Sequence, residues 1–100
     1  MPVNSQSITT GNGVIDGCKY AAFRDKSVGD VNMLLVGFCQ GIVFGVFDAR
    51  KDLSFCPPSK APLGQGVKIL AKYLENNPDK LHLPATVLAE LSFKEAWPCQ

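Results

Sequence analysis

The residues of this chain most suited to bond formation or metal binding are its four cysteines. They are Cys18, Cys39, Cys56 and Cys99. No two of them form a C-x-x-C pair, and His82, the one histidine, is not near any of them in sequence, so no metal site is expected. An even number of widely spaced cysteines in a small domain favours two disulfides, and therefore an oxidising compartment. The alternative is four buried free thiols in a cytosolic protein.

No combination of residues predicts catalysis, because an active site needs several groups that act together. His82 lies in a Leu-His-Leu-Pro turn, where it is expected to cap or pack. Asp48 and Asp52 flank Arg50 and Lys51, which favours a solvated, ion-paired helix end over a catalytic carboxylate pair. No glycine-rich phosphate loop is present. We therefore expect a protein that is not an enzyme and that has no cofactor.

The composition indicates one globular domain. The chain has 100 residues, of which 46% are apolar, which is enough for one core. Its net charge is +1, from 10 basic and 9 acidic residues, and the basic residues are scattered. Nucleic-acid binders usually carry a basic excess, so this class is not expected. Residues 1–8 are polar and predict a flexible N-terminal arm, followed by a helical domain over 9–100.

Hydrophobic periodicity predicts an all-α bundle of about four helices. The first begins near Thr9 or Thr10, which can cap it. The third covers roughly 64–76, and the fourth begins at Pro84. The residues expected on the inner faces of these three helices are Val14, Cys18, Val67, Leu70, Leu74, Val87, Leu88 and Leu91.

The second helix is expected over the apolar segment 31–47. This segment is shorter than the roughly 20 residues of a membrane span, and Asp30 and Asp48 enclose it. We therefore expect a fully buried central helix and no membrane span.

Gly37, Gly41 and Gly45 recur at a spacing of four within this segment. The spacing places a stripe without side chains along one helix face, which another helix could approach closely. We expect the stripe to pack inside the domain rather than at a dimer interface. On that expectation Gly41→Leu would cost roughly 1–3 kcal/mol by overpacking.

Helix topology ranks the three possible disulfide pairings. Short connections make neighbouring helices antiparallel. Cys56 and Cys99 then follow the second and fourth helices at the same end of the bundle. At about 1.5 Å per residue, Cys18 and Cys39 lie within about one helical turn of each other along the first two helices. We predict the disulfides Cys18–Cys39 and Cys56–Cys99, which would staple the bundle.

Residues 50–62, in the longest predicted loop (49–63), are the candidate surface for a partner protein, because loops on rigid scaffolds commonly carry binding function. The residues expected to contact the partner are Arg50, Lys51, Asp52, Leu53, Phe55 and Lys60. The charged side chains would steer the partner, and Leu53 and Phe55 would be apolar anchors. Three prolines and the tether at Cys56 would hold the loop in shape before binding. Alternatively, Phe55 covers the core and the loop only connects two helices. The partner would then contact the outer face of the third helix or a dimer groove.

Several short segments recur together in a known family. They are 37–41 (GFCQG), 45–49 (GVFDA), 55–58 (FCPP), 73–75 (YLE), 82–85 (HLPA) and 96–99 (AWPC). In their order and spacing, from about Cys18 to Cys99, the chain resembles type VI secretion amidase immunity proteins of the Rap/Tai type.

This resemblance implies a small periplasmic protein that binds a secreted peptidoglycan amidase, its cognate effector, and blocks the active site. It also implies a possible homodimer, because homodimers are known in the family. The sequence begins without a signal peptide, so one is expected in the natural precursor. Two alternatives stay open: a periplasmic stress or chaperone-like protein, and an accessory protein of an envelope complex with no toxin partner.

Overall fold

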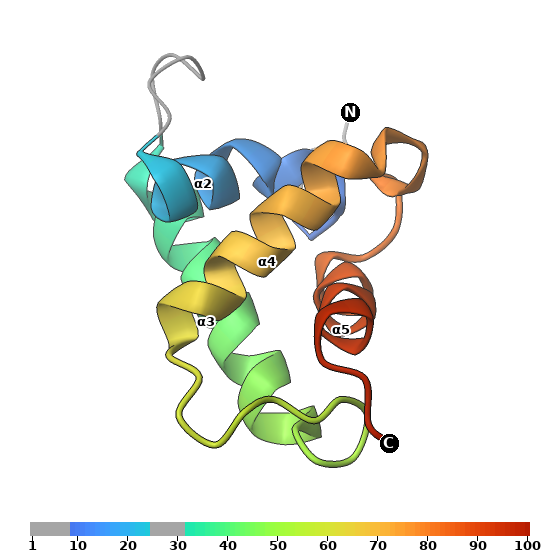
Figure 1. Cartoon of the computed structure of the whole chain (residues 1–100). Helices are drawn as coiled ribbons and strands as arrows, with labels where there is room; N and C mark the ends of the chain where they lie inside the picture. The colour runs from blue at the N-terminus through green and yellow to red at the C-terminus, as the bar shows by residue number, and fades with distance from the viewer. Residues whose placement is uncertain (1–8, 25–31) are drawn as a thin grey trace.

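The computed structural model describes residues 9–24 and 32–100, and every regular element in these two ranges is helical, as predicted. The elements are α2 (Gly11–Phe23), α3 (Met33–Arg50), α4 (Leu63–Asn76), the short 3₁₀ helix η2 (Pro78–Lys80) and α5 (Ala85–Ala96). Figure 1 shows α2 lying across one end of α3, with α4 crossing α3 and α5 packed against both. The predicted arm 1–8 lies outside the described residues.

The start of α2 is fixed by a side-chain cap and by the turn that precedes α5. Thr10 caps the helix, and its hydroxyl accepts a hydrogen bond from the Gly13 amide. The first amides of α2 have no partners within the helix. Two of them donate to the turn, from Gly11 to the Leu83 carbonyl (3.0 Å) and from Asn12 to the Leu81 carbonyl (2.9 Å). The N-terminus of α2 and the approach to α5 therefore form one unit.

Both predicted disulfides are present. Cys18–Cys39 joins α2 to α3, and both of its residues are fully buried. Cys56–Cys99 joins the loop after α3 to the residues after α5. In the chain-entropy account each bond contributes on the order of 3–4 kcal/mol by restricting the unfolded chain. The domain is therefore stapled at two separate places.

The core contains nearly all of the residues that periodicity placed there, with two differences. Val14, Val67, Leu70, Leu74 and Leu88 are buried, and so is Cys18. Leu91 is only partly buried. Val87 is 43% exposed, so its predicted burial is wrong. It lies on the face of α5 that turns toward a surface groove, described below.

The prediction of a fully buried central helix is also wrong. One face of α3 packs in the core through Val36, Cys39 and Val43, but Leu34 is 75% exposed and Phe44 is 58% exposed. By length and composition α3 could cross a membrane, and 28% of its residues are buried in the domain. Within the described residues, the other helices cover only one side of α3, so its apolar composition extends onto the surface.

The glycine stripe lies on the exposed side of α3, which corrects its predicted place inside the domain. A Cβ atom built on Gly37, Gly41 or Gly45 would meet no described atom within 4 Å. The close helix approach occurs instead at Gly17 of α2, where a Cβ would lie 2.5 Å from the Leu35 carbonyl oxygen. The spacing of four correctly placed the glycines on one face, but it could not say which face the core covers.

Substituting alanine at two of these glycines should therefore have opposite effects. Gly17→Ala forces a methyl group against the backbone of α3 and should destabilise the fold by roughly 1–3 kcal/mol or more. Gly41→Ala meets open space and should stabilise α3 by up to about 1 kcal/mol through helix propensity. Chemical denaturation with intact disulfides measures both. Equal destabilisation by the two substitutions would contradict this arrangement of α2 and α3.

Candidate protein-binding surface

The chain turns sharply after α3, and backbone hydrogen bonds close this turn. The amides of Leu53 and Ser54 both donate to the Arg50 carbonyl (3.0 and 2.9 Å), and the Asp52 amide donates to the Phe55 carbonyl (2.7 Å). Asp52 has a φ of 65°, in the left-handed region. Aspartate adopts that region more readily than most residues because its short side chain can hydrogen-bond locally. Residues 51–55, named here the α3 turn, thus have a defined backbone.

Phe55 anchors the α3 turn in the core. Its side chain is fully buried, and its ring centroid lies 5.0 Å from that of Phe93 and 5.9 Å from that of Phe47. The next residue, Cys56, donates its amide to the Trp97 carbonyl (2.8 Å) and forms the disulfide to Cys99. Phe55 is therefore a core residue in this structure and is not available as an anchor for a partner, which agrees with the alternative stated above.

The remaining predicted contact residues lie at the surface. Leu53 is 74% exposed at the tip of the α3 turn, and Lys51 and Asp52 are exposed beside it. A hollow of about 430 Å³ lies between the turn and the prolines of the loop; Lys51 and Asp52 line it. Lys60 is exposed later in the same loop but does not line this hollow. Residues 50–53 thus lie together at the α3 turn, whereas Lys60 lies elsewhere on the loop.

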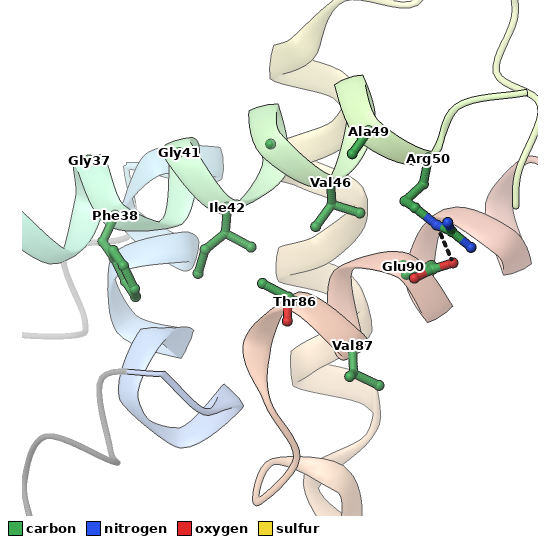
Figure 2. Close-up of a pocket in the computed structure, with 11 residues that line it drawn as sticks. Gly37, Phe38, Gly41, Ile42, Val46, Ala49, Arg50, Thr86, Val87 and Glu90 are labelled. Atoms are coloured by element: carbon green, nitrogen blue, oxygen red, sulfur yellow. Dashed lines mark hydrogen bonds and ion pairs between the residues drawn. The ribbon is translucent and has the colours of Figure 1, made fainter. Parts of the chain in front are cut away.

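A groove between α3 and α5 was not predicted from the sequence (Figure 2). Its volume is about 640 Å³, which is within the usual range of specific ligand sites. The lining residues are Gly37, Phe38, Gly41, Ile42, Gly45, Val46, Ala49 and Arg50 from α3, with Thr86, Val87 and Glu90 from α5. The glycine stripe was the signal in the sequence that could have indicated this groove, had it been placed on the surface.

The groove and the α3 turn meet at an ion pair. Arg50 Nε lies 3.3 Å from the Glu90 carboxylate, as Figure 2 shows. The pKa of Glu90 is lowered, first by the Ser54 hydroxyl and then by Arg50 and Lys94, while partial burial opposes the shift. The Ser54 hydroxyl is buried, and its geometry toward the described residues does not meet that of a hydrogen bond. The Glu90 carboxylate is the acceptor on which this hydroxyl acts. The turn and the groove are therefore one continuous surface.

These features define a class of protein. It is a small disulfide-bonded helical domain in which an exposed, hydrogen-bonded turn adjoins an apolar groove. A family model described as Rap1a immunity proteins matches residues 10–99, and the chain belongs to this family. No curated protein and no solved structure matches the chain significantly. Membership implies an immunity protein that acts against a secreted effector, as an inhibitor rather than an enzyme, and the disulfides fit a place outside the cytoplasm.

The contact between the turn and the groove predicts how Glu90 titrates. Its pKa in the folded protein should lie below that of an ordinary glutamate, and Ser54→Ala should raise it more than Lys94→Gln does. Because the folded pKa is the lower one, the carboxylate stabilises the fold above its unfolded pKa. This contribution is lost as the pH falls through the folded pKa. NMR titration of the Glu90 side chain measures the shift, and an unchanged value in Ser54→Ala would contradict the contact.

Proposed function

We propose that this chain is a periplasmic immunity protein that binds a peptidoglycan amidase effector of a type VI secretion system and inhibits it. Family membership supports the class, and the resemblance to the amidase-specific members supports the target. The structural observation that carries the proposal is the α3 turn, which presents Leu53 on a backbone held by hydrogen bonds, a buried ring and a disulfide.

Such a turn can inhibit an enzyme without any chemistry of its own. An apolar side chain that enters a cleft loses its contact with water and excludes substrate at the same time. Because the turn is already ordered, binding loses little conformational entropy. The exposed charges of Lys51, Asp52 and Lys60 can increase the rate of encounter.

The proposal keeps α3 within the folded domain rather than in a membrane. Its inner face supplies Val36 and Val43 to the core, and Cys39 is bonded to Cys18 of α2. Insertion into a bilayer would remove both buried valines from their partners. The proposal also includes a homodimer, for which the resemblance is the only support.

Protection of cells tests the proposed function. A candidate peptidoglycan amidase effector would be expressed with a signal peptide, with or without this chain in the same compartment. Lysis is expected with the amidase alone. Survival is expected when the chain also carries a signal peptide, but not when it is kept in the cytoplasm. Lysis despite periplasmic expression of the folded chain would contradict the proposal.

Leu53 offers a direct test of the α3 turn, with Leu34 as its matched control. The two side chains are equally exposed, at 74% and 75%, but Leu34 lies at the start of α3. Leu53→Ala should weaken amidase binding at least tenfold, or about 1.4 kcal/mol, while Leu34→Ala leaves it unchanged. Isothermal titration calorimetry measures both. Equal affinities of the two variants would exclude the turn as the main contact.

Changing the charges of Lys51 and Asp52 in the α3 turn, together with that of Lys60 later in the loop, should act mainly on association. Lys51→Glu and Lys60→Glu combined with Asp52→Asn should leave the fold intact, because all three side chains are exposed and asparagine tolerates the left-handed backbone of position 52. The triple variant should bind the amidase more slowly, and the difference should shrink at high salt. Stopped-flow association rates measure this effect. Unchanged rates at low salt would show that these charges do not face the partner.

A further inference from the structure

The guanidinium of Arg50 at the end of the α3–α5 groove is only partly used. Its Nε atom contacts Glu90, and neither terminal amino group forms a hydrogen bond or ion pair with a residue in the described part of the chain. The side chain is half exposed. A guanidinium offers a planar fork of donors that matches a carboxylate in a bidentate arrangement. Arg50 can therefore bind a second acidic group without releasing Glu90.

The charges around the groove favour an acidic ligand at this end. Among the residues that line the groove, only Arg50 and Glu90 are charged. Lys94, one helical turn beyond Glu90 on α5, also acts on the Glu90 carboxylate. Glu90 thus forms an ion pair with Arg50 and also feels the charge of Lys94, so one carboxylate balances two nearby cations only in part. The remainder of the groove is formed mainly by apolar side chains and glycines.

We propose that the α3–α5 groove binds a segment of the amidase effector in which apolar side chains are followed by an aspartate or glutamate. The apolar side chains lie over Gly41 and Gly45, against Ile42 and Val87, and the acidic side chain bonds to the free amino groups of Arg50. This inference rests on the proposed function and names a second contact for the same partner. Arg50 ends α3 directly before the α3 turn, so one face of the effector can contact both places.

Gly45 allows the groove to be filled without disturbing the fold, and Gly64 provides a matched control outside the groove. A Cβ at Gly45, which lines the groove, or at Gly64, at the start of α4, would meet no described atom within 4 Å. Gly64 lies in a separate hollow beside Phe44. Leucine at either position also improves helix propensity. Gly45→Leu should weaken binding of the effector at least tenfold, while Gly64→Leu binds as the unmodified chain does.

The acidic contact is tested separately at Arg50. Arg50→Gln should weaken effector binding about tenfold or more, and Arg50→Lys should recover part of this loss because it restores the charge without the fork. Circular dichroism and retained disulfides confirm folding of each variant. Affinity of Arg50→Gln equal to that of the unmodified chain would overturn the acidic contact.

The outcomes separate this inference from the proposed function. If the unmodified chain binds no peptidoglycan amidase effector, the proposed function fails, and the groove contact fails with it. If the unmodified chain binds and Gly45→Leu binds equally well, only the groove inference is overturned. Sedimentation of the chain alone tests whether a second copy of the chain occupies the groove instead. A dimer that Gly45→Leu dissociates, with amidase affinity unchanged, would assign the groove to a second copy and overturn the inference.

Discussion

The packing of Phe55 against Phe47, Phe93 and Trp97 is the interaction on which the proposed binding surface depends. The ring of Phe55 belongs to the loop, whereas Phe47 belongs to α3 and Phe93 to α5, so one buried ring ties the loop to two helices. The disulfide Cys56–Cys99 reinforces the same junction covalently. Without this anchor, only the backbone hydrogen bonds of the α3 turn would maintain its conformation, and water would compete for them. The surface that we assign to the partner is thus built on the core.

Helix α3 determines what kind of surface this can be. One of its faces is required for the core, through Val36 and Val43, and for the disulfide at Cys39. Its other face carries glycines and apolar side chains and is left uncovered by α2, α4 and α5 within the described residues. A large exposed apolar surface often marks a site of interaction with a protein or a membrane. The groove, the ion pair of Arg50 with Glu90 and the α3 turn all follow from this exposed side.

The sequence was sufficient to predict the helices and the disulfides, but not to predict which helix faces are buried and which are exposed. Helical periodicity predicted α4 and α5 closely. The assumption of antiparallel helices selected the correct pairing of the cysteines, although α2 lies across the end of α3 in the structure. Three apolar positions show where this reasoning ends. Val87 is apolar but borders the groove, Phe55 lies in a loop but fills the core, and Gly41 lies in the most hydrophobic segment but is exposed. Periodicity predicts which residues share a helix face. Whether that face is buried depends on how helices that are distant in the sequence cross it.

Amide hydrogen exchange of the free protein tests most directly the central claim that the binding surface is ordered before the partner arrives. The amides of Asp52, Leu53 and Ser54 are all bonded to backbone carbonyls within the α3 turn and its junction with α3. The account predicts that these three amides exchange far more slowly than those of an unstructured loop, with protection that falls when Phe55 is replaced by alanine. Exchange at the rate of an unstructured peptide in the unmodified free protein would contradict it.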